Sequence, residues 1–317
     1  MGDCAGVGPE LALTCAAIPE VTERCTPVLI GPRRILQRIS EQLDLALPSS
    51  DFRSSQWDGV SAACWDVGEI ECDEVTAGKF NHRTGLASFV AVDAAITETL
   101  ASRLDAIVTG PIQKEAWHAA NVPFIGHTEL LAERTGTSDY SMMLTSDVIS
   151  CVLCTIHIPL ADVVGSLTRE SIVRAIRLGG AALSRRLKRP ARVAVLGLNP
   201  HAGENGLLSH GEEESLIGPA IEQARGEGFD IVGPLPPDTA FTPAMRDQVD
   251  VYVCMYHDQG LIPLKTLSFD DGVNVTLGLP IVRTSVDHGT AMNIAWQGKA
   301  RSTSMQRAIE MAIDLVG

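Results

Sequence analysis

Short apolar segments alternate with longer amphipathic segments along almost the whole chain, and this alternation limits the fold more than any other feature. Strand-like runs such as PVLIG, DAIVTG and RVAVLGLN stand between helical patterns such as TGLASFVAVDAAITETLASRL and TRESIVRAIRLGGAALSRRL. Strands that alternate with helices of this length are typical of α/β proteins whose helices flank the sheet. The 317 residues, 45% of them hydrophobic and 20% charged, are enough for two packed domains.

Charge, apolar run length and cysteine usage disfavour several partners. The chain has 39 acidic and 25 basic residues, and no run of lysine or arginine, so a surface for nucleic acid is disfavoured. No apolar run reaches the roughly 18 residues of a membrane span, and no secretory signal pattern begins the chain. The eight cysteines form no paired framework. We therefore predict a cytoplasmic protein that binds neither nucleic acid nor membrane.

Two local motifs resemble known sites without matching them. Cys151 and Cys154 form a C-x-x-C, but residues three apart on a strand point to opposite faces, so core packing is favoured over metal binding. The segment GDCAGVGPE is a glycine-rich turn that leads into a helix, yet it has neither Rossmann nor Walker spacing. A strand normally precedes such a turn, so we expect that strand to be either absent or clipped. Anion binding at the helix N-terminus stays open.

Three apolar runs each end on a histidine. SCVLCTIH ends on His157, RVAVLGLNPH on His201 and VDVYVCMYH on His257. A lone histidine at a strand end is usually a surface residue or a cap, but three such ends suit a site assembled from separate strands. Catalytic metal sites use three protein ligands and leave one position open. Asp258 and Glu204 are candidate carboxylates to orient the imidazoles, and imidazole ligands favour zinc, cobalt, nickel or ferrous iron.

Two further segments combine polar groups with apolar, strand-like surroundings. Lys265, Asn274 and Arg283 lie in or beside GVNVTLGLPIVRTSVDHGTA, where an unpaired charge would be costly unless it met an anion. The alternative is internal pairing with nearby aspartates. In PFIGHTELLAERTG, His127 and Thr128 stand at a helix start, where either an anion site or an N-cap threonine is expected.

These motifs occur together in one family. The segments MGDCAGVGPE, TGPIQKEAW, FIGHTEL, GLNPHAGENG, PLPPDTAF, MYHDQGLIPLK and GVNVTLGLPIVRTSVDHGTA resemble the 4-hydroxythreonine-4-phosphate dehydrogenase family of vitamin B6 biosynthesis, over nearly the whole chain. The resemblance implies a two-domain α/β fold of the isocitrate/isopropylmalate dehydrogenase type, with the active site in the interdomain cleft. It places residues 1–122 and 286–317 in a discontinuous first domain, and residues 123–285 in a second domain that carries the metal ligands and dimer contacts.

The resemblance also implies roles for single residues and for the assembly. It implies a homodimer with a shared active site, NAD or NADP, and a divalent metal, zinc first, with cobalt, magnesium or manganese as alternatives. His257 would join His157 and His201 from the partner subunit. The substrate-binding positions would be His127, Thr128, Lys265, Asn274 and Arg283, and those of the cofactor would be His288, Gly289, Thr290, Ala291 and Asn293.

The chain departs from the family pattern at three positions. Cys4 stands where the family usually has proline. Trp296 replaces a usual glycine, and Arg301 departs from the usual Asn-Pro. The last two differences lie in the expected adenosine loop, so the resemblance does not choose between NAD and NADP.

The implied reaction is oxidation of the C3 hydroxyl of 4-phosphohydroxy-L-threonine, followed by decarboxylation. The general base is not identified, and Asp238, Asp258 and Asp287 are the candidates. The alternative substrates are 4-phospho-D-erythronate and 4-phospho-D-threonate of sugar-acid catabolism, whereas the phosphate-site motifs disfavour the aromatic cis-diol branch. An alternative of another class is a metal-dependent phosphoester hydrolase, and a non-catalytic phosphosugar-binding protein is a further one.

Overall fold

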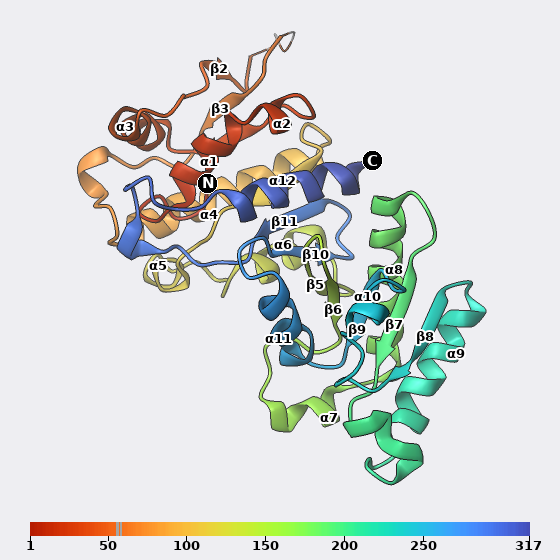
Figure 1. The fold of residues 1–317 in the computed structure, drawn as a ribbon. Coiled ribbons are helices and arrows are strands. Elements are labelled where there is room, and N and C mark those ends of the chain that lie inside the picture. The colour runs from red at the N-terminus through yellow and green to blue at the C-terminus, as the bar shows by residue number, and fades with distance from the viewer. Residues whose placement is uncertain (55–56, 58) are drawn as a thin grey trace. The chain divides into compact units, whose positions relative to one another are not determined.

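The computed structural model describes residues 1–54, 57 and 59–317, and these divide into two compact units (Figure 1). Unit 1 comprises residues 1–137 and 279–316, and unit 2 comprises residues 138–278 with Gly317. The α/β class predicted from the sequence is confirmed. Helix α6 (His127–Thr135) lies in unit 1, whereas the sequence prediction, with boundaries at 122/123 and 285/286, placed it in the second domain.

Unit 1 contains two sets of parallel strands. Strands β1 (Val28–Gly31), β3 (Ala63–Asp66) and β2 (Ser50–Asp51) lie side by side in that order. Strand β4 (Ala106–Thr109) pairs in parallel with β11 (Val282–Val286). The helices of this unit, besides α6, are α1 (Gly8–Ala16), α2 (Pro19–Thr22), α3 (Arg33–Leu43), α4 (His82–Leu100), α5 (Lys114–Ala119) and α12 (Thr303–Val316).

Unit 2 is built on a mixed sheet with the strand order β10-β5-β6-β9-β7-β8. Its central strands β6, β9 and β7 are parallel, whereas β5 runs antiparallel to both of its neighbours. The strands are β5 (Ser141–Thr145), β6 (Ser150–Leu153), β7 (Arg192–Leu196), β8 (Asp230–Leu235), β9 (Val251–Cys254) and β10 (Val273–Leu277). The helices are α7 (Val163–Ser166), α8 (Arg169–Leu187), α9 (Gly218–Gly226), α10 (Pro243–Arg246) and α11 (His257–Leu267).

Local sequence explains where the two longest helices begin and end. The side chain of Asn81 accepts hydrogen bonds from the backbone N–H groups of Arg83 and Thr84 at the start of α4. Thr168 and Ser171 form a capping box at the start of α8, and Lys188 ends that helix in the left-handed conformation. Such caps satisfy backbone groups that a helix end leaves without partners. The predicted bounds of both helices are therefore close to the observed ones.

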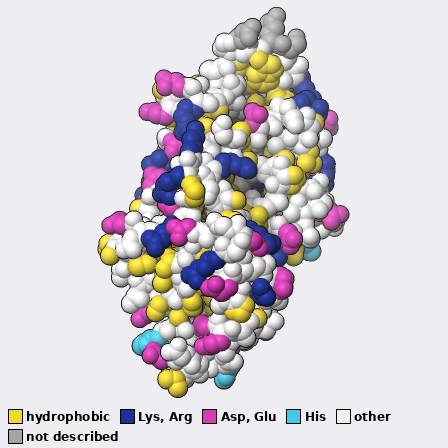
Figure 2. Space-filling view, turned by 90° about the vertical axis from the view of Figure 1, so that its right-hand side faces the viewer, with side chains coloured by type: hydrophobic (Ala, Val, Ile, Leu, Met, Phe, Trp, Pro, Cys, Tyr) yellow, Lys and Arg dark blue, Asp and Glu magenta, His cyan; other side chains and the backbone are white. Residues whose placement is uncertain are grey.

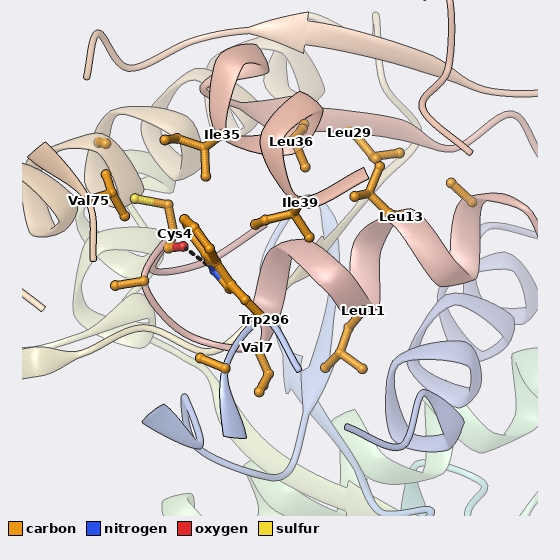
Figure 3. Close-up of a cluster of buried hydrophobic side chains, with 14 of the residues drawn as sticks. Cys4, Val7, Leu11, Leu13, Leu29, Ile35, Leu36, Ile39, Val75 and Trp296 are labelled. Carbon is orange, nitrogen blue, oxygen red and sulfur yellow. Dashed lines mark hydrogen bonds between the residues drawn. The ribbon is translucent and has the colours of Figure 1, made fainter. Parts of the chain in front are cut away.

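Unit 1 has more than one apolar cluster, and Trp296 belongs to the cluster drawn in Figure 3. Its indole is 2% exposed and packs among side chains of the N-terminal turn and helix α3, including Cys4, Ile35 and Ile39. The indole Nε1 donates a hydrogen bond to the carbonyl oxygen of Cys4, 3.1 Å away. The N-terminal turn and the 288–300 loop are thus held together, although they are almost 300 residues apart in sequence.

Three observations bear on the predictions from composition. Cys151 and Cys154 are both buried and reduced, as predicted for core packing.

On the face of the molecule drawn in Figure 2, acidic and basic side chains are interspersed. Among the described residues, none of the helices combines the length and the apolarity that crossing a bilayer requires.

Candidate active site

The three predicted histidines follow three adjacent parallel strands of unit 2. His157 comes after β6, His201 after β7 and His257 after β9, and these strands are neighbours in the order β6-β9-β7. Because the carboxyl ends of parallel strands meet at one edge of a sheet, all three histidines belong to the same edge. Although they are far apart in sequence, the three histidines therefore follow strand ends at one edge of the sheet.

Two of the three histidines are close to each other within one chain. The ring centroids of His157 and His257 are 5.5 Å apart. A zinc–nitrogen distance of about 2.1 Å places each centroid roughly 3.2 Å from an ion, so rings up to about 6.4 Å apart can share one ion. Among the described residues, no three His, Cys, Asp or Glu side chains lie close enough together to hold a metal. His201 is therefore not brought to the other two histidines within a single chain.

His201 begins a stretch of left-handed backbone. All five residues from His201 to Asn205 have φ between 45° and 81°, and only Gly203 among them is a glycine. Left-handed geometry costs roughly 1–2 kcal/mol for each non-glycine residue, so its surroundings must enforce this conformation. The imidazole of His201 lies on the surface, with 63% of its side chain exposed.

The Nδ1 atoms of His201 and His257 each contact a carboxylate. Nδ1 of His201 lies 3.0 Å from Oε2 of Glu204, and Nδ1 of His257 lies 2.7 Å from Oδ1 of Asp258. A carboxylate can only accept a hydrogen bond, so Nδ1 donates in both pairs, and Nε2 is the ring nitrogen left to face a metal. This is the arrangement that metal-binding histidines commonly have. The residues that the sequence analysis named as orienting carboxylates are the ones that make these contacts.

Gln259 joins two of the strand ends, and the sequence analysis missed it. Its side chain is buried; Nε2 donates to the carbonyl oxygen of Gly197, and Oε1 accepts from the backbone N–H of Met255. Gly197 follows β7 and Met255 follows β9, so one amide links the segments that lead to His201 and His257. Its place next to His257 and Asp258 in the motif YHDQG could have pointed to it in the sequence.

In unit 1, His127 and Arg283 form a second polar group. Arg283 is 3% exposed and donates from Nη2 to Oγ1 of Thr109 at 2.7 Å, and burial lowers its pKa to about 10. Burial, together with the nearby Arg283 guanidinium, lowers the pKa of His127 well below its usual value. The imidazole is therefore neutral at pH 7, and its buried Nε2 has no hydrogen-bond partner among the described residues.

Helix α6 begins beside this group without a side-chain cap. Its N-cap is Gly126, so the N-cap interpretation of Thr128 is wrong, and Thr128 is the second residue of the helix. The first backbone N–H groups of a helix lack partners within it and attract anions. A Cβ added to Gly126 would lie 3.5 Å from Cε and 4.0 Å from Nζ of Lys114, a cation that the sequence analysis missed. Oε2 of Glu129 would lie nearer still to that Cβ, at 3.4 Å, so the helix start combines Lys114 with a carboxylate, and the buried Arg283 adds a second cation to this part of unit 1.

The other two predicted substrate-binding residues belong to unit 2. Lys265 lies in the last turn of α11, with its Nζ 5.4 Å from the centre of the Phe269 ring. Asn274 lies on β10, and its side-chain Oδ1 is buried without a hydrogen-bond partner in the part of the chain that the structure describes. Unit 1 thus carries His127, Thr128 and Arg283, and unit 2 carries Lys265 and Asn274.

The loop predicted to bind the cofactor is held by the N-terminal turn. The backbone N–H of Val7 donates to the carbonyl oxygen of Thr290 at 3.0 Å, and Thr290 Oγ1 donates to Gln113 Oε1 at 3.1 Å. Glu10 is 3% exposed, and its Oε2 accepts from the backbone N–H of Gly298. His288, Gly289 and Asn293 are exposed, so they are accessible to a ligand, while Ala291 is left-handed with φ 43°.

The three candidate bases differ in their surroundings. Asp258 contacts Nδ1 of His257, and Asp238 lies exposed in the turn after β8. Asp287 directly follows β11 and is half-buried, and its backbone N–H donates to Oγ of Ser304. Asp258 therefore contacts one of the candidate metal ligands.

Comparison with known proteins gives consistent relatives over the full length. The family model described as pyridoxal phosphate biosynthetic protein PdxA matches residues 23–312. A 4-hydroxythreonine-4-phosphate dehydrogenase of Desulfosudis oleivorans is 46% identical, with 99% of this chain and 94% of that protein covered. A D-threonate 4-phosphate dehydrogenase of Cupriavidus necator is 40% identical, with 99% and 96% covered. A crystal structure of the 4-hydroxythreonine-4-phosphate dehydrogenase from Klebsiella pneumoniae is 38% identical, with a TM-score of 0.86 and coverage of 100% and 96%.

Proposed function

The chain belongs to the pyridoxal phosphate biosynthetic protein PdxA family, and from this premise we propose that it is an NAD(P)-dependent dehydrogenase of a 4-phosphorylated four-carbon hydroxy acid. The principal substrate is 4-phosphohydroxy-L-threonine, and the alternatives are 4-phospho-D-threonate and 4-phospho-D-erythronate. The observation that carries the proposal is the set of histidines beyond three adjacent parallel strands, because it supplies metal ligands for oxidising an alcohol.

The metal site we propose is shared between two copies of the chain. The 5.5 Å spacing of His157 and His257, with Nδ1 of His257 held by Asp258, fits two ligands of one zinc ion from the same chain. This spacing favours His201 as the partner's ligand, whereas the sequence analysis grouped His201 with His157. Exposed apolar side chains on the same three segments support a second copy as the partner. They are Ile158, Leu160, Leu207, Leu208, Ile262 and Phe269.

The side chains of this protein would bind and orient the substrate. Arg283, fixed by Thr109, and the uncapped start of α6 with Lys114 suit an anionic group, and the neutral His127 can exchange a hydrogen bond there. Lys265 and Asn274 would bind the remaining polar groups. His157 and His257, with His201 of the partner subunit, would hold the metal, which would supply Lewis-acid polarisation of the alcohol oxygen, and NAD(P) would supply the hydride acceptor. The hydroxyl proton would pass to Asp238 or Asp287, and carbon dioxide would leave the resulting β-keto acid.

The first test compares substrates directly. Purified, zinc-supplemented protein is assayed for NADH and NADPH formation with 4-phosphohydroxy-L-threonine, 4-phospho-D-erythronate and 4-phospho-D-threonate under matched conditions. Preference for the first places the enzyme in vitamin B6 synthesis, and preference for the others places it in sugar-acid catabolism. Release of inorganic phosphate without reduction of the cofactor would instead support the hydrolase.

The second test locates the histidines by mixing inactive variants as heterodimers. If His201 comes from the partner, mixing His201→Ala with either His157→Ala or His257→Ala rebuilds one complete site per heterodimer. Random reassociation would then restore about a quarter of the wild-type activity. The mixture of His157→Ala with His257→Ala would stay inactive. If His257 is the partner's ligand, that mixture regains activity and the mixture of His157→Ala with His201→Ala does not, and a site within one chain gives no restoration in any mixture.

A further inference from the structure

Glu213 lies against the loop that carries His201, at the start of the π-helical turn Glu213–Ile217 that precedes α9. We propose that Glu213 is a positioning residue that holds this loop in the conformation required for metal binding. The inference rests on the proposed function, because it takes His201 to be a metal ligand. It goes beyond that function by assigning a role to a carboxylate that contacts neither His201 nor the substrate-binding residues.

The buried carboxylate of Glu213 binds the backbone just before the left-handed stretch. The residue is 4% exposed, and its Oε1 accepts hydrogen bonds from the backbone N–H groups of Leu198, at 2.9 Å, and Asn199, at 2.8 Å. Its Oε2 accepts from the side-chain amide of Asn199 at 3.1 Å. Hydrogen bonds to a charged acceptor are stronger than neutral ones. The chain direction is therefore set two residues before His201.

Glu212 closes the loop from its other end. Its Oε2 accepts from the side-chain amide of Asn199 at 3.0 Å and from the backbone N–H of His210 at 2.8 Å. The amide of Asn199 is thus shared by both glutamates. The two adjacent carboxylates tie the beginning and the end of the 199–210 segment to one helical turn.

The middle of the loop packs against the same carboxylate. A Cβ added to Gly203 would lie 2.7 Å from Oε2 of Glu213, a distance that real Cβ atoms essentially never show. Gly203 also has φ 81°, which a residue with a side chain adopts only at a cost. Glu213 therefore contacts the loop both before His201 and at its apex, which supports the left-handed backbone in between.

This backbone sets the side-chain geometry of the histidine. His201 and Glu204 are three residues apart on the left-handed turn, and that turn brings Nδ1 to 3.0 Å from Oε2. If the contacts of Glu213 are weakened, His201, Ala202, Glu204 and Asn205 can relax toward right-handed conformations, which are favoured for L-residues. The imidazole would then leave its position without any loss of the unit 2 core.

The main experiment measures zinc affinity of the apoprotein by competition with a chromophoric chelator, together with Tm in zinc-free buffer. Glu213→Gln keeps the side-chain volume but replaces one acceptor oxygen with an NH2 group that cannot accept from Asn199. We expect a 10–100-fold loss of affinity, the size seen when residues that orient metal ligands are replaced. The matched control is Glu214→Gln, an exposed neighbour with the same charge change, which should stay within about twofold of wild type.

A second pair of variants keeps the test independent of Glu213 itself. Gly203→Ala and Gly211→Ala replace glycines of similar left-handed φ, 81° and 93°. Among the described residues, nothing lies within 4 Å of a Cβ on Gly211, whereas a Cβ on Gly203 meets Glu213. We expect Gly203→Ala to lose at least tenfold in zinc affinity and Gly211→Ala to lose much less, although both carry the backbone penalty.

The outcomes separate this inference from the proposed function. If Glu213→Gln lowers Tm but binds zinc as wild type does, or if Glu214→Gln weakens binding equally, the positioning role is wrong. If Glu213→Gln does not fold, equal zinc affinities of the two glycine variants overturn the role. If the wild-type protein does not bind zinc, or if His201→Ala binds zinc as tightly as wild type does, the proposed metal site is wrong. This inference then fails with it.

Discussion

The His201 loop of unit 2 and the 288–300 loop of unit 1 both contain left-handed residues beside a buried glutamate, but they are stabilised differently. In the His201 loop, carboxylate oxygens accept the bonds that hold the segment, and the histidine itself is exposed. In the 288–300 loop, the Glu10 carboxylate also accepts a backbone hydrogen bond, from Gly298. What this loop has in addition is the left-handed Trp296 (φ 60°), whose indole is buried in the apolar core with Arg38 stacked on the ring at 5.0 Å.

The difference separates two ways of holding a loop. Hydrogen bonds to carboxylates have preferred directions, so they fix the orientation of a backbone and of the ligand it carries. Burial of a large ring is not directional, and it contributes mainly to the free energy of unfolding. We therefore expect changes in unit 2 to affect metal affinity and changes in unit 1 to affect stability.

The largest expected effect is that of His201→Ala on the metal. Replacing residues that only orient a metal ligand costs 10–100-fold in affinity, so loss of the ligand itself should cost at least about 100-fold in zinc affinity and in kcat/KM. Binding of NAD, measured by calorimetry, should stay within about twofold of wild type. The 288–300 loop, where we expect the cofactor to bind, is held by unit 1 residues and not by His201. If His201→Ala lost both zinc binding and NAD binding, the two loops would be coupled, and their separate roles would be contradicted.

The next effect is the loss of stability when Trp296 is replaced. Trp296→Ala should lower the free energy of unfolding by about 3–5 kcal/mol, as for other buried tryptophans. Trp296→Gly should cost about 1 kcal/mol less despite its smaller side chain, since glycine adopts φ 60° without strain. Urea unfolding followed by circular dichroism measures both. Equal costs for the two variants would contradict strain at this position, and a change in zinc affinity would contradict the separation of roles.

The smallest effect is that of Glu10→Gln on the pH dependence of stability. Burial raises the pKa of Glu10, and the backbone N–H groups between residues 296 and 300 oppose this to a lesser extent. A carboxyl group with a raised pKa favours the folded state at low pH, and this contribution is lost as the pH rises through the folded-state pKa. Glu10→Gln should remove that slope and change stability at pH 7 by less than about 1 kcal/mol. An unchanged slope would mean that other carboxyl groups cause it.

The sequence predicted the fold class, and that the three histidines follow strand ends, for a clear reason. Apolar periodicity marks strands and helices, and the carboxyl ends of adjacent parallel strands lie together. The prediction could not supply the strand order that makes β6, β9 and β7 neighbours. It also could not supply the ring spacing that favours pairing His157 with His257.

Other features have no sequence signal that local reasoning can use. His, Ala, Glu and Asn have no strong preference for left-handed backbone as a run, so residues 201–205 cannot be read as such. Glu213 stands in EEESLIG, where acidic residues at a helix start normally face solvent, yet it is buried. The position of α6 in unit 1 depends on its packing against α4, which a boundary drawn from motif order does not include.

In the left-handed turn at His201, L-residues adopt, at a cost, the helical backbone conformation that D-residues prefer. Semisynthesis with D-alanine at position 202, where φ is 51°, should therefore relieve roughly 1–2 kcal/mol of strain, whereas the same exchange within α8 should cost a similar amount. D-residues at such positions could thus stabilise the His201 loop while the side chains stay chemically the same.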